Sequence, residues 1–225
     1  MAISVEQQLA NMRKAWDERA RDNARHWVAT GRTDWTDDAF FASGEQQIAE
    51  DILTDMGNIC QGKDPAEMRV LEIGCGAGRL TRALAKRFGE VHAVDISSEM
   101  IAEAKKALAD YPNAHVYQNN GCDLSVIPEI AFDFAYSAIV FQHIPSREII
   151  ENYIREVHRL LRPGALFKFW VMGDPRAQTS PEETWVGVTF SEEEAKAMAE
   201  RCGFEARYNY GAGQQYFILW FFKKP

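Results

Sequence analysis

The stretch Val70–Thr81, VLEIGCGAGRLT, places a short apolar run with one acid directly before three glycines at alternate positions. The apolar run indicates a short buried strand, and the residues from Arg79 onward are typical of a helix. Glycine has no Cβ atom, so a glycine-rich turn lets a ligand approach the backbone closely. A strand, such a turn and a helix N-terminus together form a site for a ribose or an anionic group. A tight turn that binds nothing is the alternative.

The glycine spacing and a second acid narrow the choice of ligand. Gly74, Gly76 and Gly78 read GxGxG, whereas the dinucleotide fingerprint GxGxxG would have its third glycine at the position of Arg79. Asp95 ends the apolar pattern VHAVD, which we interpret as the next strand. A carboxylate there can accept hydrogen bonds from both ribose hydroxyls of an adenosine-containing ligand. A helix N-cap is the alternative role for Asp95, but its spacing behind the glycines favours ribose binding.

From Arg69 the chain alternates between strand and helix patterns. Strands are expected at 69–73, 90–96, 113–120, 132–141 and 165–172, and helices at 79–88, 98–109 and 147–161. This alternation predicts a parallel sheet with helices on both faces.

The last third of the chain departs from that rhythm. Residues 173–190 predict a long loop or cap, and Ser191 with Glu194 forms a capping-box pattern that opens a helix to about Arg201. Two apolar strands, 204–210 and 214–222, are then separated only by GAG. A parallel crossover needs a dozen or more residues, so these strands should form an antiparallel hairpin at the sheet edge.

The first sixty residues predict helices. Apolar and aromatic residues from Met12 to Trp27 recur every three or four positions, and a second helix is expected over 43–59. A chain of 225 residues suits one compact domain. We therefore expect an N-terminal helical lid at 1–62, a Rossmann-like domain at 63–225, and a cap insertion at about 172–190.

Composition excludes several classes of function. The net charge of −8 argues against broad nucleic-acid binding, which needs a basic face. No apolar run is long enough to span a membrane, and the N-terminus lacks the apolar core of a signal peptide, so we expect a cytoplasmic protein with no membrane partner. The four cysteines are far apart in the sequence, which makes disulfides and structural zinc poor interpretations. Asp123 and Asp133 lack a third ligand, so we expect no metal.

Several ordered motifs together resemble the class I S-adenosylmethionine-dependent methyltransferase family, of the small-molecule type. They are LEIGCGAGR, VHAVD, QNNGCDL, FDFAYSAIVFQHIP and LLRPGALFKF, spread over about Arg69–Val171, with the terminal hairpin as a further match. The resemblance implies an α/β fold: a Rossmann-like, doubly wound, mostly parallel seven-stranded sheet with an antiparallel terminal hairpin. It also implies S-adenosyl-L-methionine as the cofactor, S-adenosyl-L-homocysteine as the product, and no metal.

The resemblance assigns cofactor-binding roles residue by residue. Glu72 and the loop Gly74, Cys75, Gly76 and Gly78 would hold the methionine part. Asp95 would hold the ribose, with Ile96 packing beside the adenine. Asn120, Gly121 and Cys122 would meet the adenine edge, although many members of the family have Asp at the position of Asn120. Ser137 would lie beside the methionyl group.

The remaining assignments concern the methyl acceptor. A hydroxyl or ammonium acceptor must lose a proton, and His143 is the one histidine expected near the reacting atoms, so it is our candidate general base. A role in lining the pocket is the alternative. Gln142, His143, Trp170 and Trp185 are candidate substrate contacts, and Arg19 could reach the cofactor carboxylate. The other histidines, His26, His92, His115 and His158, we assign to packing or to the surface.

We therefore expect methyl transfer to an oxygen or nitrogen of a small-molecule acceptor. A methyltransferase acting on protein or nucleic acid would share the core, but the acidic charge and the sequence SAIVFQHIP, which stands where an Asn-Pro-Pro tetrapeptide would be expected, disfavour it. A catalytically silent cofactor-binding or scaffold protein is a second alternative. A nicotinamide oxidoreductase is a third, disfavoured by Arg79 and the terminal hairpin. The oligomeric state is not predictable from the sequence.

Overall fold

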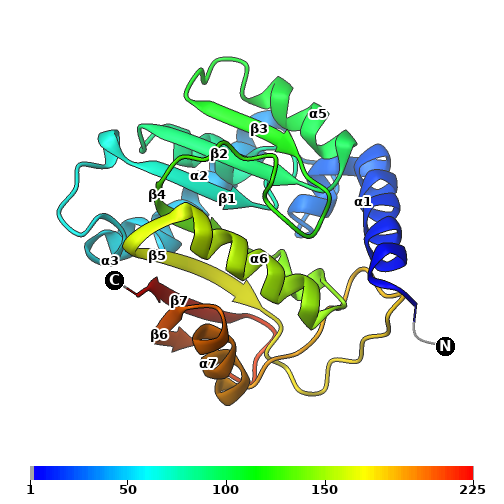
Figure 1. Cartoon of the computed structure of the whole chain (residues 1–225). Coiled ribbons are helices and arrows are strands. Elements are labelled where there is room, and N and C mark those ends of the chain that lie inside the picture. The colour runs from blue at the N-terminus through cyan, green and yellow to red at the C-terminus, as the bar shows by residue number, and fades with distance from the viewer. Residues whose placement is uncertain (1–2, 225) are drawn as a thin grey trace.

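A computed structural model describes residues 3–224 as one seven-stranded sheet with helices on both faces (Figure 1). The strand order is β3-β2-β1-β4-β5-β7-β6. The strands are β1 (Arg69–Ile73), β2 (Glu90–Asp95), β3 (Ala114–Gln118), β4 (Phe132–Ser137), β5 (Leu161–Val171), β6 (Phe204–Tyr210) and β7 (Phe217–Lys223). The helices are α1 (Val5–Val28), α2 (Asp37–Asp51), α3 (Met56–Cys60), α4 (Arg79–Ala85), α5 (Ser98–Ala107), α6 (Arg147–Leu160) and α7 (Glu192–Arg201), with 3₁₀ turns at Leu53–Asp55, Pro65–Glu67 and Phe141–His143.

The sheet has the mixed topology that the sequence predicts. Strands β3, β2, β1, β4 and β5 are parallel, and β7 pairs antiparallel with both β5 and β6. The expected terminal hairpin is therefore confirmed. Its second strand, β7, lies inside the sheet and leaves β6 at the edge. Because the first five strands are parallel, their carboxyl ends meet at one edge of the sheet, where loops that bind ligands are commonly found.

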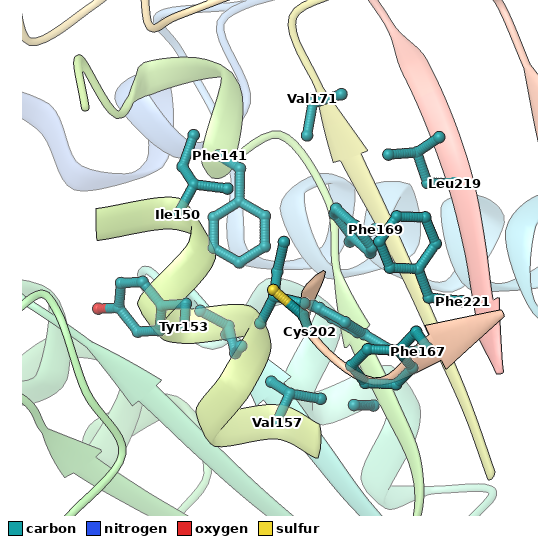
Figure 2. Packing of buried hydrophobic residues seen from close by; sticks show 14 of the residues in the cluster. Phe141, Ile150, Tyr153, Val157, Phe167, Phe169, Val171, Cys202, Leu219 and Phe221 are labelled. Carbon is teal, nitrogen blue, oxygen red and sulfur yellow. The ribbon is translucent and has the colours of Figure 1, made fainter. Parts of the chain in front are cut away.

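Two apolar layers hold the helices to the sheet. On one face α6 packs on the sheet through a large aromatic core, drawn in Figure 2. Its labelled members are Phe141, Ile150, Tyr153, Val157, Phe167, Phe169, Val171, Cys202, Leu219 and Phe221. On the other face the core includes Ile48 and Ile52 at the end of α2, Ile59 of α3 and Leu84 of α4, all of them fully buried.

The second helix differs from the expectation of 43–59. It begins at Asp37, because the side chain of Thr36 accepts a hydrogen bond from the Ala39 N–H and caps the helix N-terminus. It ends at Asp51, and a 3₁₀ turn separates it from the short helix α3. The helix therefore begins six residues before the expected start, because the Thr36 side chain accepts a hydrogen bond from a free N–H group of the first turn.

The boundary between α6 and β5 also differs from the expectation. The sequence RPG was expected to end the helix and precede a strand at 165–172. Instead β5 begins at Leu161, which adopts an extended conformation and pairs with Phe132 of β4. The register between β4 and β5 then shifts. Pro163 and Gly164 thus lie within β5 at this irregularity. Proline is tolerated there because the hydrogen bonding between the strands is interrupted and its missing N–H leaves no bond unmade.

The N-terminal helices occupy two different places. α2 packs against α4 and belongs to the buried core, whereas α1 packs against α5 and lies beside the carboxyl edge of the sheet (Figure 1). Segment 172–190 has no regular element beyond an isolated bridge between Met172 and Thr189. None of the helices within residues 3–224 is both long and apolar enough to cross a membrane.

Candidate active site

A cavity of about 260 Å³ opens at the carboxyl ends of β1, β2 and β4. Its floor is the glycine-rich loop after β1, and its walls include residues of α1, α6 and segment 172–190. Of the residues assigned from the sequence, it brings together Glu72, Gly74, Cys75, Gly76, Asp95, Ile96, Gly121, Gln142, His143 and Trp185. The glycine loop after β1, the residues that follow β4 and segment 172–190 are far apart in the sequence, and they meet at this cavity.

The loop after β1 needs glycine for conformation and for space. Gly74 and Gly76 have φ of 76° and 50°, in the left-handed region. A Cβ at Gly74 would lie 2.2 Å from Val140 Cγ2, and one at Gly76 would lie 2.6 Å from Val28 Cγ2. Val140, which follows β4, and Val28, the last residue of α1, therefore lie too close to this loop for a side chain at Gly74 or Gly76.

Asp95 is tied to the glycine loop by its carboxylate. Its Oδ2 accepts the Gly76 N–H at 2.9 Å and its Oδ1 accepts the Ser97 N–H at 2.9 Å. Burial raises the pKa of Asp95 to about 6 in spite of these two backbone donors. Each oxygen retains a lone pair, so the carboxylate can accept two further hydrogen bonds from a ligand.

Glu72 is a buried acid with an unsatisfied oxygen. It lies on β1 just before the loop, and burial raises its pKa to about 7. Among the described residues, Glu72 Oε2 has no hydrogen-bond partner, and neither does Gln142 Oε1. Both side chains line the cavity. Two unpaired acceptors at one cavity indicate that a ligand carrying N–H or O–H donors belongs there.

Arg79 lies beside these acids at the start of α4. It is buried, and its Nη2 donates to Gln47 Oε1 at 2.6 Å. Its Nε has no partner within residues 3–224. Arg79, which occupies the position of the third glycine in the dinucleotide fingerprint, is thus a buried cation that connects the cavity to α2. The sequence did not predict this role.

His143 packs between two tryptophans at the cavity wall. Its ring centroid lies 5.4 Å from that of Trp16 and 4.7 Å from that of Trp185. Its Nδ1 lies 2.5 Å from the Trp185 carbonyl oxygen, which assigns the proton to Nδ1 and leaves Nε2 as an acceptor. Burial lowers the pKa of His143 to about 4. Burial thus desolvates the imidazole and disfavours its protonated form.

Arg19 joins α1 to segment 172–190. Its guanidinium carbon lies 4.7, 5.5 and 5.3 Å from the ring centroids of Trp16, Trp27 and Trp185. Its two terminal nitrogens donate to the carbonyl and hydroxyl oxygens of Thr184, both at 3.1 Å. Arg19 therefore holds the two parts of the cavity roof together, and its guanidinium is engaged by the roof itself.

Five residues assigned from the sequence do not line the cavity. The Ser137 hydroxyl donates to the Ile73 carbonyl inside the sheet, and Asn120 instead accepts the N–H groups of Cys122 and Asp123 in a local turn. Cys122 is held in that turn beside Asn152. Trp170 does not line the cavity but packs on Tyr216, which does, and Gly78 is the N-cap of α4.

Neighbouring residues take some of these places. Asn119 lines the cavity in place of Asn120, and its amide donates to the Tyr153 hydroxyl at 2.7 Å. Adjacent amides on an irregular turn cannot be distinguished by sequence alone. Ile139, two residues after the end of β4, has φ of 58°. A β-branched residue in that region is strained by roughly 1–3 kcal/mol, and such strain gathers at functional sites.

Asp133, weighed above as a metal ligand, is held by cations at the opposite end of its strand. Lys63 Nζ and Arg162 Nε donate to it at 2.9 Å, and it also accepts the Arg69 N–H. These donors occupy the carboxylate as a structural ion-pair centre.

The part of the chain that forms most of the cavity is similar to a known protein family. Residues 70–164, which run from β1 into β5, match the model of a methyltransferase domain family. This match covers less than half of the chain, and it shows a likeness to methyltransferase domains over that segment. The matched range contains the glycine loop, Asp95 and His143, and it ends before segment 172–190.

Curated relatives of this chain carry several named activities. The chain is 33% identical to a malonyl-[acyl-carrier protein] O-methyltransferase of Enterobacter lignolyticus over 116 residues, 51% of this chain and 41% of the relative. It is 33% identical over 130 residues to the Salmonella typhimurium protein of the same name, 57% of this chain and 46% of that one. A phosphoethanolamine N-methyltransferase of Caenorhabditis elegans is 32% identical over 97 residues, 42% of this chain and 22% of the relative. The chain thus spans less than half the length of these relatives.

Solved structures share the fold over almost the whole chain. A DhpI–SAH complex superposes with a TM-score of 0.66 at 19% identity and covers 99% of this chain and 100% of its own. A magnesium protoporphyrin IX methyltransferase of Synechocystis with bound SAM gives 0.65 at 18% identity, covering 96% and 97%. At such low identity these likenesses show the fold of the chain and nothing of its activity.

Proposed function

We propose that the protein transfers a methyl group from S-adenosylmethionine to an oxygen or nitrogen of a small organic acceptor. The observation that carries the proposal is the convergence of Glu72, Asp95 and the Gly74–Gly76 loop on one cavity at the carboxyl ends of β1 and β2. Glycines give access to the backbone, and the two acids supply acceptors on either side of it.

The polar groups of the cavity fit this cofactor. S-adenosylmethionine presents an ammonium group, two ribose hydroxyls and a sulfonium charge, all of which favour acceptors or negative charge. The cavity offers the free lone pairs of Asp95 and the unpaired oxygens of Glu72 and Gln142. Burial that raises the pKa of both acids makes a cationic partner more favourable, since the cation compensates for the lost hydration of the carboxylates.

The chain's own residues have distinct proposed roles. Asp95 would bind the ribose hydroxyls, Glu72 would face the ammonium group, and Gly121 and Ile96 would border the adenine. The bound cofactor supplies an already activated methyl group, so the protein must mainly position the acceptor and exclude water. Trp16 and Trp185 would exclude water from above the reacting atoms.

His143 is proposed to orient the acceptor. Its Nδ1 is bound to the Trp185 carbonyl, so its Nε2 is the free acceptor for an O–H or N–H of the substrate. With a pKa of about 4 the ring is neutral at physiological pH and is a weak base. It would therefore hold the acceptor by a hydrogen bond and take up a proton only as the methyl group transfers.

A carrier-bound acid is the second candidate acceptor. This candidate is favoured by the similarity to two malonyl-[acyl-carrier protein] O-methyltransferases. The matched segment covers the cofactor-binding part and not the roof built from α1 and residues 172–190. The roof would contact the acceptor, and its tryptophan-rich surface favours a small organic molecule.

The test combines calorimetry of cofactor binding with an assay of methyl transfer. The purified protein is titrated with S-adenosylmethionine, S-adenosylhomocysteine and NAD, and isotopically labelled methyl transfer is then screened against a metabolite library and a malonyl-carrier protein. Micromolar binding of the first two ligands with transfer to a metabolite supports the proposal. Binding without any transfer would favour a silent cofactor-binding protein, and binding of NAD alone would overturn the cofactor assignment.

A further inference from the structure

A second cluster of ligand-type side chains lies at the opposite end of β2 from the cavity. Glu90 and His92 are two residues apart on β2, so their side chains share one face of the sheet. His115 of β3 is the direct parallel partner of His92 and lies on the same face. Glu90 begins β2 and Asp95 ends it, so roughly 16 Å of strand separate this cluster from the ribose-binding acid.

The three side chains present their ligand atoms to one point. Glu90 Oε1 lies 3.0 Å from His92 Nε2 and 3.5 Å from His115 Nε2. All three ligand atoms lie within 4.8 Å of one another. A tetrahedral zinc ion with bonds of about 2.0–2.2 Å separates its ligand atoms by about 3.3 Å, so the trio already approximates one face of that tetrahedron.

Two neighbouring groups orient the trio. The Tyr117 hydroxyl lies 3.0 Å from His92 Nδ1, and Arg69 Nε donates to the other oxygen of Glu90 at 2.9 Å. Partners of this kind select the tautomer of a ligating histidine and fix the direction of a ligating carboxylate. With Nε2 on a metal, His92 would donate its Nδ1–H to Tyr117, which the present distance allows.

The site is open on one side. His92 is buried, whereas the side chains of His115 and Glu90 are 42% and 32% exposed. A metal ion can therefore enter from solvent and keep a water molecule as its fourth ligand. Two imidazoles and one carboxylate are a donor set that zinc and neighbouring divalent transition metals prefer over magnesium or calcium.

The geometry points to a zinc site formed by Glu90, His92 and His115 at the β2–β3 edge of the sheet. This goes beyond the methyltransferase activity and takes no part in it, because the cluster lies at the far end of the strand. The ion would bridge the edge strand β3 to β2. It also goes beyond the packing roles expected for His92 and His115 from the sequence.

The test measures zinc binding by the full chain. Protein stripped with chelator is titrated with zinc, and cobalt(II) is used as a spectroscopic probe of geometry. We expect one zinc per chain and the intense visible absorption of tetrahedral cobalt. Both signals should be lost in His115→Gln and in Glu90→Gln, while Tyr117→Phe should weaken zinc affinity roughly tenfold.

Two control variants localise the ion. His26→Gln removes a histidine of α1 outside the cluster, and Cys122→Ser removes a partly exposed thiol, so both should bind zinc like the parent. Circular dichroism of the His115→Gln variant checks that the fold is retained. If the parent binds zinc only as weakly as His115→Gln does, the trio is a hydrogen-bonded network only and the proposal is overturned. If His115→Gln binds one zinc as tightly as the parent, the ion lies elsewhere and the proposal is also overturned.

Discussion

Asp95 combines two roles in a single side chain, since it fixes the glycine loop and faces the cavity. Its two backbone hydrogen bonds hold Gly76 and Ser97, and its remaining lone pairs are free for a ligand. Asp95→Asn keeps the shape but removes the charge. We expect cofactor affinity to fall roughly 10- to 100-fold, which corresponds to about 1–3 kcal/mol for a lost hydrogen bond to a charged group.

Calorimetry with S-adenosylmethionine at pH 8 measures this effect. Asp110→Asn is the matched control, because Asp110 is an exposed acid just after α5 and away from the cavity. Equal affinity of the parent and Asp95→Asn would remove Asp95 from the site.

The turnover role of His143 is testable with His143→Ala. The variant should lower the turnover rate roughly 10- to 100-fold, the size of about 1.5–3 kcal/mol for a positioning hydrogen bond. Cofactor affinity should change little, because the proposed partner of Nε2 is the acceptor. Single-turnover rates and calorimetry separate the two quantities, and a variant with parental rates across pH 6 to 9 would assign His143 to packing alone.

Desolvation of His143 also makes stability depend on pH. The pKa of His143 is 6.5 in an unfolded chain and about 4 in the fold, so between these values the unfolded state binds more protons. The stabilisation from the neutral ring is thus fully present above pH 6.5 and is lost as pH falls toward 4. It amounts to roughly 3 kcal/mol at about 1.4 kcal/mol for each pH unit.

Between pH 4 and 6.5 we expect the free energy of unfolding of the parent to rise by roughly 3 kcal/mol relative to that of His143→Gln. Urea unfolding from pH 4 to 7 gives the free energy of unfolding of each protein, and the difference between them isolates the histidine. The difference is needed because Glu72 and Asp95, whose pKa values are raised to about 7 and 6, act in the opposite direction. Parallel curves for the two proteins would mean that His143 titrates normally.

At the scale of elements, the cavity roof consists of α1 and segment 172–190. α1 is not one regular helix, because Asn23 has non-helical dihedral angles. The residues after this break bring Trp27 and Val28 to the cavity, and Val28 reaches the glycine loop. Segment 172–190 has little secondary structure of its own. Its attachment to α1 therefore depends on side chains, chiefly Arg19.

Arg19→Ala should loosen the roof. The guanidinium loses its cation–π contacts and both hydrogen bonds to Thr184, which together are worth about 1–2 kcal/mol. Opening of segment 172–190 should become roughly tenfold more frequent, and limited proteolysis there should accelerate by the same factor. Arg21→Ala is the control, since Arg21 lies on the same helix but pairs with Glu99 at the surface. Equal cleavage rates in the two variants would contradict the role of Arg19.

At the scale of the whole molecule, the cofactor would connect the cavity roof, α1 and segment 172–190, to the carboxyl ends of β1 and β2. The cavity is lined by β1, β2, α1, α6 and segment 172–190 together. A ligand that binds only the folded state stabilises it by about 2.7 kcal/mol at a hundred times its dissociation constant. For a domain of this size we expect a rise in Tm of about 2–4 °C for each kcal/mol.

Differential scanning calorimetry with and without S-adenosylmethionine measures this stabilisation. The shift should be much smaller in Asp95→Asn at the same cofactor concentration, since the affinity of that variant is lower. A full shift in Asp95→Asn would indicate that the cofactor binds elsewhere on the molecule.

Features that depend on neighbouring residues could be predicted from the sequence. The alternation of strands and helices, the glycine loop, the acid at the end of β2 and the capping box of Ser191 and Glu194 were all predicted, and the structure contains each of them. These features follow from local periodicity, from the conformational freedom of glycine and from side-chain caps. The short GAG link likewise required an antiparallel hairpin.

The tertiary structure alone decided how distant segments meet. Arg19 and Thr184 are 165 residues apart, and no local pattern pairs them. The choice of Asn119 over Asn120 depends on how one turn packs against Tyr153, and the lowered pKa of His143 depends on burial between Trp16 and Trp185. The His–Glu–His cluster likewise exists only because β3 pairs in register with β2. Long-range packing sets these contacts, and burial then sets the charge state of each group within them.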